Sequence, residues 1–448
     1  MDTSPSSLQA LQAELRGTEG LDLLTSPGDL ERYSRDAYDY SPVLAPLLRH
    51  CRAQLVVRPH CVAAVMAVAG ACARAAVPLT LRGAGTGNYG QCVPLKAGVV
   101  MLMGELNAVR DLDPSTGVVQ VESGVILKDL DRSLGCHGRQ LRLMPSTWRS
   151  ASVAGFVAGG SGGIGSVRWG FLRDPGHLLG LEVVTVEREP RLLQLDAERA
   201  EALNHAYGTN GIITALTLST APRVDWHEVY VDCDDWSTAL SLAQDCQMAA
   251  VDLFLCTVLD RQIVDALPAW SPSAQGCHRL LLLVSPDGIS TVRRLAKAVG
   301  ARFQSLGPET PQQGNGLREL SWNHTTLHLR QRDADWTYLQ MLLPQPESAA
   351  IRDLSARWGS DLLWHLEGVR HAGAARMAAL PLVRWRGQES LEVLMQHCRD
   401  LGAVLFNPHV ITVEDGGLGI VDGDQVTAKR KHDPDGLLNP GKLRGWTP

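Results

Sequence analysis

The chain of 448 residues is long enough for roughly two or three domains, and its 45% hydrophobic and 20% charged residues exclude wholesale disorder. The net charge of −6 argues against a dedicated nucleic-acid binder, which would carry a basic surface. The N-terminus lacks the apolar core of a secretory signal, and the longest uncharged apolar run, 62–73, is too short to cross a bilayer. We therefore expect a cytoplasmic protein without a transmembrane segment.

The first half of the chain alternates short apolar strands with helices. In chain order the pattern predicts a strand at 53–57, a helix at 61–75, strands at 79–81, 99–103 and 118–122, a helix at 127–134, and strands at 181–187, 192–195 and 212–219. Between them, the stretch 145–170 follows neither the helical nor the strand period.

The pattern changes after Pro222, where helices and strands alternate more regularly. It predicts strands at 229–231, 253–258, 280–284, 337–343 and 362–366, and helices at 236–248, near Ile263, and at 291–303, 348–358 and 390–401. This order predicts an α+β domain of ferredoxin-like character, with helices on one face of an antiparallel sheet. The residues after 405 are expected to form a tail without regular elements, since prolines and glycines interrupt its end.

Glycine is concentrated in one part of the chain: 17 of its 43 glycines lie between Gly83 and Gly170. Two stretches, 85–90 and 160–165, match Gly-x-Gly-x-x-Gly. A dinucleotide site of the Rossmann type needs a helix that opens on this motif, and the pattern predicts no helix after either stretch. Two readings stay open: both loops converge on one anionic diphosphate, or they are tight turns of a β-rich domain.

Several motifs in the same order resemble the FAD-binding domain of the vanillyl-alcohol oxidase and para-cresol methylhydroxylase (PCMH) superfamily. They are LRGAGTG at 81–87, GELN at 104–107, DPSTG at 113–117, VQVESGV at 119–125, SVAGFVA at 152–158, GGIGSVRWG at 162–170 and DPDGLLNPGK at 433–442. The chain looks most like the FAD-linked oxidases that include the glycolate oxidase flavin subunit and D-lactate dehydrogenases. The resemblance implies a PCMH-type FAD-binding domain with two subdomains, followed by the α+β substrate (cap) domain.

Carried over residue by residue, the resemblance implies a set of FAD contacts. The diphosphate would be wrapped by Arg82, Gly83, Ala84, Gly85, Thr86, Gly87 and Asn88, and the flavin ring approached by Pro145, Ser146 and Thr147. Further contacts would come from Ser152, Gly155, Gly162, Gly163, Ser166, Arg168, Ile213, Asn439 and Lys442. For Arg82 and Arg168 a surface ion pair is the alternative.

The sequence departs from the family in ways that bear on its chemistry. Covalent members attach FAD through a histidine at the position of Thr86, and no cysteine lies between Cys136 and Cys233, so we expect non-covalent FAD. The metal motif of the 2-hydroxy-acid branch keeps only its start, at His371. The ten cysteines include no Cys-x-x-Cys pair. We therefore expect reduced thiols and no metal site.

The resemblance implies that a C–H bond next to oxygen delivers hydride to flavin N5 while a base takes the hydroxyl proton. Imidazole suits that role because its pKa lies near neutrality. His409, beside a proline in the returning tail, is the first candidate, and His324 is the second. The alternative for each is a capping or surface histidine. Arg318 or Arg330 could pair with a substrate carboxylate, although structural salt bridges are the more common use.

Together these observations predict four segments: 1–52 packing on the FAD domain, 53–222 binding FAD, 223–405 forming the substrate domain, and 406–448 returning to the FAD domain. The expected activity is FAD-dependent oxidation of a CH–OH donor, a 2-hydroxy acid or related small polar alcohol. Alternatives are a sugar-alcohol or aldonolactone oxidase on the same fold, or a non-catalytic flavin-binding subunit. A small-molecule substrate, an unidentified electron acceptor and a possible partner subunit complete the expectation.

Overall fold

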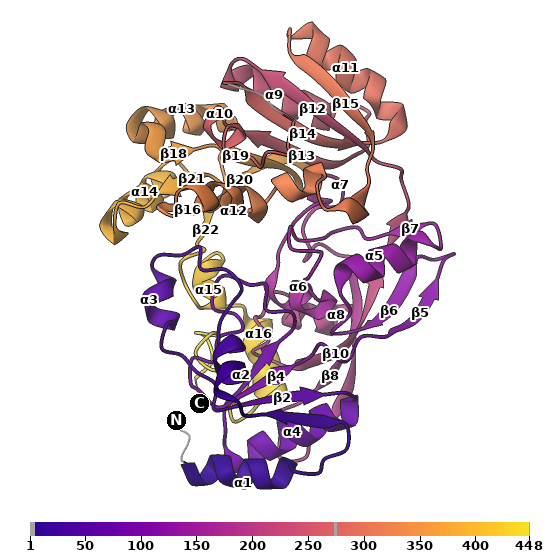
Figure 1. Ribbon diagram of the computed structural model, residues 1–448, viewed down its shortest axis with the longest axis vertical. Helices are drawn as coiled ribbons and strands as arrows, with labels where there is room; N and C mark the ends of the chain where they lie inside the picture. The colour runs from indigo at the N-terminus through magenta and orange to yellow at the C-terminus, as the bar shows by residue number, and fades with distance from the viewer. Residues whose placement is uncertain (1–4, 273–275, 448) are drawn as a thin grey trace.

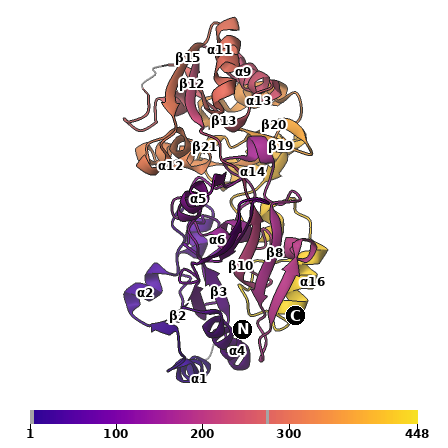
Figure 2. The same cartoon turned by 90° about the vertical axis from the view of Figure 1, so that its right-hand side faces the viewer.

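The computed structural model describes residues 5–272 and 276–447 and arranges them in two lobes along the long axis of Figure 1. Both ends of the chain lie in the lower lobe, as the two views in Figures 1 and 2 agree. The middle of the chain, from about residue 227 to 406, forms the upper lobe. This one long segment therefore leaves the lower lobe and returns to it, and the short segment 166–169 also reaches the sheet of the upper lobe.

The first sheet of the lower lobe has the order β1-β2-β4-β3. It comprises β1 (Leu21–Leu24), β2 (Leu55–Pro59), β3 (Leu79–Arg82) and β4 (Val99–Leu102), with β1 antiparallel and the others parallel. Helix α4 (Val62–Ala75) connects β2 to β3, and α1 (Pro5–Leu15) packs on it. The strands are almost wholly apolar because both faces are covered, as is usual for parallel strands.

The second sheet of the lower lobe is antiparallel, in the order β5-β6-β10-β8-β9. Its strands are β5 (Val109–Asp113), β6 (Val118–Glu122), β8 (Leu178–Val184), β9 (Leu192–Asp196) and β10 (Ile212–Ser219). Beside it lie α5 (Leu127–Gly135), α6 (Val153–Gly159), α8 (Ala197–Ala200) and the β7 (Arg139–Gln140) and β11 (Ala221–Pro222) pair. The short helix α7 (Ser166–Trp169) instead packs against the sheet of the upper lobe (Figure 1).

The upper lobe contains an antiparallel eight-stranded sheet in the order β15-β12-β14-β13-β19-β20-β17-β22. These strands are β12 (His227–Cys233), β13 (Leu253–Leu259), β14 (His278–Val284), β15 (Arg302–Pro308), β17 (Gln340–Leu342), β19 (His365–His371), β20 (Ala374–Ala379) and β22 (Val404–Phe406). Four helices share an apolar core with this sheet: α9 (Trp236–Met248), α11 (Ile289–Ala298), α13 (Glu347–Trp358) and α14 (Gln388–Asp400). A smaller sheet joins β16 (Trp336–Tyr338), β21 (Leu382–Arg384) and β18 (Leu362–Leu363).

The prediction of an α+β architecture is confirmed, but several predicted elements are wrong in detail. The strand predicted at 362–366 is divided between β18 and β19, which belong to different sheets. The helix predicted at 291–303 ends at Ala298, and Gly300 in the left-handed region turns the chain into β15. The strand predicted at 337–343 is divided between β16 and β17, which belong to different sheets. The tail is not irregular, since α15 (Val413–Gly416) and α16 (Gly423–His432) lie within it.

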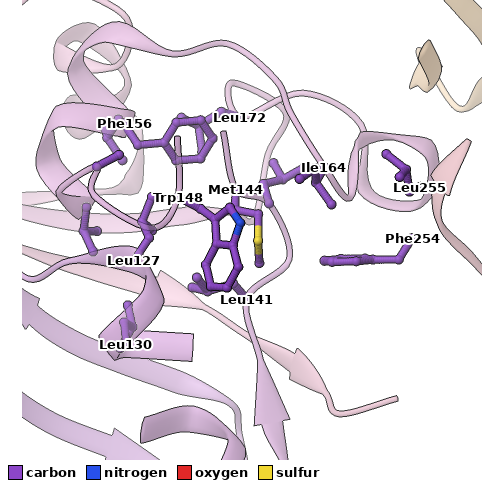
Figure 3. Packing of buried hydrophobic residues seen from close by; sticks show 14 of the residues in the cluster. Leu127, Leu130, Leu141, Met144, Trp148, Phe156, Ile164, Leu172, Phe254 and Leu255 are labelled. Carbon is purple, nitrogen blue, oxygen red and sulfur yellow. The ribbon is translucent and has the colours of Figure 1, made fainter. Parts of the chain in front are cut away.

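One hydrophobic cluster runs through the junction of the lobes (Figure 3). Met144, Trp148 and Ile164 of the lower lobe share it with Phe254 and Leu255 of β13. The Gly165 N–H donates to the Phe254 carbonyl at 2.9 Å. This continuous packing keeps the 145–170 segment, which lacks a regular sequence pattern, in one place between the lobes.

Candidate active site

The main cavity of the described chain has a volume of about 610 Å³ and takes its lining from both lobes. The lower lobe supplies the two glycine-rich loops, and the upper lobe supplies residues 322–324, Gln340 and the 406–408 turn. Residues 38 and 40 and the 413–425 segment complete the wall. A volume of this size is within the roughly 300–1,000 Å³ that is usual for ligand and cofactor pockets.

The first glycine loop presents free backbone donors to the cavity. None of the N–H groups of residues 83–88 makes a hydrogen bond to another described residue. Gly85 has φ +73°, which a residue with a side chain rarely adopts. The Ala37 N–H donates to the Gly85 carbonyl at 2.9 Å and holds the loop from outside. A run of free N–H groups is a suitable cradle for an anion.

The second glycine loop meets the first one directly. Ser152 caps α6 by accepting the Gly155 N–H at 3.3 Å. A Cβ atom on Gly83 would lie 2.2 Å from the Ser152 Oγ, so the first loop reaches this contact only as glycine. In the second loop, a Cβ atom on Gly163 would lie 2.1 Å from the Met144 carbonyl oxygen. The convergence expected of the two loops is therefore present in the fold.

We expect Gly163→Ala to weaken FAD binding, since the added methyl must displace backbone that lines the cavity. Overpacking of this kind costs about 1–3 kcal/mol. FAD affinity is measured by fluorescence titration of the apoprotein. Gly423→Ala is the matched control because a Cβ atom there meets nothing within 4 Å. Equal FAD affinity of Gly163→Ala and the control would contradict the prediction.

Residues from both ends of the chain hold the loop that follows Asn88. Half-buried Asp36 accepts the Gly90 N–H at 2.6 Å and the Cys92 N–H at 3.3 Å. Lys442 donates to the carbonyls of Gln91 at 2.8 Å and Val93 at 2.7 Å. The N-terminal segment thus binds N–H groups of the loop, and the tail binds its carbonyl groups.

We call Asp36, Asn439 and Lys442, which hold the loop after Asn88, the clamp. Within it, Asp36 and Lys442 shift each other's pKa. Burial raises the pKa of Asp36, although Lys442 counters the effect. Burial also lowers the pKa of Lys442 to about 8, and here Asp36 is the principal opposing charge. Asn439 adds hydrogen bonds to the carbonyls of Gln91 at 3.0 Å and Tyr207 at 2.5 Å.

Most of the FAD contacts expected from the sequence lie on the cavity wall. These are Gly83, Ala84, Gly85, Thr86, Gly87, Asn88, Pro145, Ser146, Thr147, Ser152, Gly155, Gly162 and Gly163. Ile213 lines a smaller adjoining cavity of about 80 Å³, which shares Gly83, Ser152 and Gly155 with the main one. The two cavities together suit an elongated ligand.

Five expected FAD contacts lie behind the cavity wall. Arg82 donates to the Arg35 carbonyl at 2.6 Å, and Arg168 pairs with Asp252 at 2.9 Å. Ser166 Oγ accepts the Gly163 N–H at 3.0 Å and so shapes the second loop. Asn439 and Lys442 act through the clamp described above. The sequence motif identified these residues, but it could not separate lining residues from residues that support the lining.

The first candidate for the base, His409, does not line the cavity. Its ring is buried, with Nδ1 2.8 Å from Ser41 Oγ and Nε2 3.0 Å from the Tyr338 carbonyl. The carbonyl requires a proton on Nε2, so Nδ1 accepts from Ser41. Burial lowers the pKa of His409 to about 4, although the bond to the Tyr338 carbonyl opposes this. In this fold His409 ties the tail to the N-terminal segment and is not placed to meet a substrate.

We expect His409 to make folding stability depend on pH. Its folded pKa of about 4 is below the ordinary value of about 6.5. The unfolded chain therefore binds the proton first, and stability falls as the pH drops between these values. The stability advantage of the wild type over His409→Gln should shrink by about 2.4 kcal/mol between about pH 7 and about pH 4.5.

Urea unfolding at the two pH values measures this difference. Exposed His137, changed to Gln, is the control and should show no such trend. A stability gap between wild type and His409→Gln that is the same at both pH values would refute the buried neutral imidazole.

The second candidate, His324, lies on the cavity wall at the start of α12 (Asn323–Arg332). Its Nδ1 lies 3.4 Å from Glu319 Oε2, and Arg149 Nε donates to Glu319 Oε1 at 2.7 Å. Burial raises the pKa of Glu319, but His324 and Arg149 together outweigh it and lower that pKa, so the carboxylate is ionised. Among the described residues, no hydrogen bond reaches Nε2 of His324.

A buried glutamate fixes the turn that carries His324. Trp322 has φ +50°, which is strained for a residue with a large side chain. Its N–H donates to Glu367 Oε1 at 2.7 Å, and Glu367 also accepts from Thr257 at 2.6 Å. The upper sheet therefore determines where His324 enters the cavity.

The sequence reasoning missed a group of aromatic and amide residues beside His324. Tyr38, Tyr40, Tyr89 and Gln340 line the cavity, and the Gln340 amide donates to the Tyr89 hydroxyl at 2.9 Å. Tyr338, behind them, hydrogen-bonds Asn88 and Tyr89, at 2.9 Å each. For part of this group the signal was the pair Tyr38 and Tyr40 in the otherwise mostly polar stretch 34–41.

Arg318 and Arg330 are both engaged outside the cavity. Arg318 is buried and forms a bidentate pair with Glu309. Arg330 donates to the carbonyls of Ala334 and Trp336, and its guanidinium lies over the Tyr40 ring. The geometry therefore favours structural roles for both arginines, in a salt bridge or in hydrogen bonds to carbonyls. This is the alternative that the sequence left open.

The cavity suits FAD on three structural grounds. The free N–H groups of residues 83–88 can receive a diphosphate, and the glycine contacts leave room for close approach. Two amide oxygens on the wall, Asn323 Oδ1 and Gln425 Oε1, are buried without a hydrogen-bond partner among the described residues. Such orphaned groups are costly unless a ligand satisfies them.

Within residues 5–272 and 276–447, no group of three or more His, Cys, Asp or Glu side chains could hold a metal ion. None of the described helices has the length and apolar character needed to span a bilayer.

Residues 53–189 match the family described as "FAD binding domain". The chain is 24% identical over 423 residues to the glycolate oxidase subunit GlcD of Escherichia coli K12, covering 87% of this chain and 83% of that protein. It is 23% identical to a D-lactate dehydrogenase of Archaeoglobus fulgidus, with 91% and 95% covered.

Solved structures with the same fold share little sequence with the chain. An alkyldihydroxyacetonephosphate synthase superposes with a TM-score of 0.74 at 14% identity and covers 98% of this chain and 86% of that one. A carbohydrate oxidase from Microdochium nivale gives 0.68 at 14% identity, with 98% and 100% covered. These likenesses establish the fold of both lobes.

Proposed function

We propose that the chain is an FAD-linked oxidase with a PCMH-type FAD-binding domain and that it oxidises a CH–OH donor with His324 as the base. The observation that carries the proposal is the His324–Glu319–Arg149 arrangement at the cavity wall. The relatives named as a glycolate oxidase subunit and a D-lactate dehydrogenase support a hydroxyl-bearing substrate.

FAD would be held non-covalently by the two glycine loops and would supply the two-electron acceptor when bound. Thr86 lines the cavity at the position where covalent members of the family carry a histidine. Its hydroxyl is no partner for that linkage. Acid precipitation tests this part: the flavin should stay in the supernatant.

His324 would take the proton of the substrate hydroxyl through Nε2, since Nδ1 faces Glu319. The carboxylate of Glu319 would orient the ring and stabilise its protonated form, as paired carboxylates do for catalytic histidines. Arg149, bound to the other oxygen of Glu319, keeps that carboxylate ionised and in place. Aromatic side chains on the same wall would limit the access of water.

Anaerobic mixing with hydroxyl donors tests the proposal directly. The yellow holoprotein should bleach with at least one member of a panel of polyols, sugars, lactones and 2-hydroxy acids. If dithionite bleaches the flavin and no donor does, the enzyme proposal fails and a non-catalytic flavin subunit is favoured.

A further inference from the structure

Positive charge is scarce along the whole cavity, including the end beside His324 where a substrate would bind. No lysine and one arginine, Arg173, are found among the described residues that line it. Arg173 already pairs with Glu201 at 2.7 Å and with Asp422 at 3.1 Å, on the side of the cavity formed by the tail. Sites that bind a substrate carboxylate usually offer an arginine or lysine without such partners.

The histidines of the wall do not supply the missing charge. Arg149 already balances the charge of Glu319, so His324 in the neutral form that a base requires leaves this group without a net positive charge. His205 donates through Nδ1–H to the Gly160 carbonyl, 3.0 Å away, and burial lowers its pKa, which keeps it neutral. A substrate anion would therefore enter this end without a counter-ion, which is costly in a partly desolvated site.

The wall offers groups that suit hydroxyls instead. Asn323 lies next to His324, and its buried Oδ1 has no hydrogen-bond partner among the described residues. A hydroxyl can donate to this oxygen, whereas a carboxylate brings only acceptors. The amides of Gln340 and Asn407 and the rings of Tyr40 and Trp322 surround the same space. Aromatic faces with amides between them can bind a ring or chain that carries C–H and O–H groups.

We propose that the substrate is an uncharged polyhydroxy compound, a polyol or sugar, and not the anion of a 2-hydroxy acid. This inference rests on the proposed oxidation at the same site. It also separates this chain from what the names of its relatives suggest, since glycolate and lactate are anions at neutral pH. The absence of an unpaired cation and the orphaned acceptor of Asn323 are the two observations that support it.

Pairs of donors that differ only in charge give the sharpest test. The holoprotein is reduced anaerobically with glycolate or glycolamide, with D-lactate or D-lactamide, and with sorbitol, xylitol or glucose. We expect each neutral partner to reduce the flavin at least about tenfold more efficiently than its anion, and a polyol or sugar to be the best donor. Efficient reduction by an anion, equal to or better than its amide, would overturn the inference while leaving the proposed oxidation intact.

A binding measurement covers the case in which no donor reduces the flavin. Titration with xylitol and with oxalate is then followed through the flavin absorption spectrum. Tighter binding of xylitol supports the neutral site even though the proposed oxidation has failed. Tighter binding of oxalate overturns the neutral site.

A variant that adds a cation completes the test. Asn323→Lys should raise the efficiency of glycolate or D-lactate relative to its amide by about tenfold. Gln388→Lys adds the same charge at an exposed position of α14, away from the cavity. It should leave the ratio of anion to amide efficiency unchanged. If Asn323→Lys does not fold, the comparison of charged and neutral donors and the titration with xylitol and oxalate still test whether the site is neutral. An unchanged ratio in a folded Asn323→Lys protein would count against the assignment of Asn323 to the substrate end.

Discussion

Replacing His324 by alanine should slow anaerobic flavin reduction by about 10²–10⁴-fold, the usual contribution of a positioned general base. The side chain lies on the cavity wall, and Glu319 behind it is held ionised. FAD affinity should change little, because the glycine loops that would hold the cofactor are built from other residues. Stopped-flow absorbance at the flavin band, with the best donor of the panel, measures the rate.

Added imidazole distinguishes a base from a structural histidine. Free imidazole can fill the space left in His324→Ala and should restore part of the rate, which it cannot do for a folding defect. Glu319→Gln should cause a smaller loss than His324→Ala, since it removes the orienting carboxylate but leaves the ring. Exposed His137→Ala is the control. An undiminished rate in His324→Ala would remove His324 from the mechanism.

Replacing Lys442 by methionine should destabilise the protein by about 2–4 kcal/mol, because the change removes the hydrogen bonds from a buried ammonium group to two carbonyls. Among the described residues it leaves the Val93 carbonyl without its donor and the Gln91 carbonyl with Asn439 alone, and it removes the main positive charge that opposes the raised pKa of Asp36. Since the same loop presents Asn88 and Tyr89 to the cavity, FAD retention should fall as well. Chemical unfolding and FAD titration measure the two effects.

Lys429 offers a matched control elsewhere in the tail. It is also buried, paired with Asp433 at 2.5 Å and donating to the Leu438 carbonyl at 2.7 Å, but neither partner lines the cavity. Lys429→Met should cost similar stability and less FAD affinity. If both variants lose FAD equally, the loss follows from general destabilisation and the clamp has no specific role.

Local patterns predicted much of the fold because they depend on neighbouring residues. Helix α9 begins and ends at the predicted residues, and the Asp235 side chain caps it by accepting the Thr238 N–H. Strands that pair over long distances were harder, as β15 and the division of β16 from β17 illustrate. Strand pairing is decided by the tertiary partner more than by the strand's own residues.

The sequence by itself determined the FAD-binding half of the site, since glycine is required wherever a backbone must approach a ligand or another loop closely. That requirement acts at each position separately, so the motifs at 81–88 and 152–163 can be recognised in the sequence. Only the tertiary structure decided which histidine faces the cavity. The sequence placed His409 ahead of His324, but packing buries His409 between Ser41 and the Tyr338 carbonyl and leaves His324 on the cavity wall beside Glu319. The same holds for charge: whether an arginine is free to bind a substrate depends on carboxylates distant in the chain, which only the folded protein brings together.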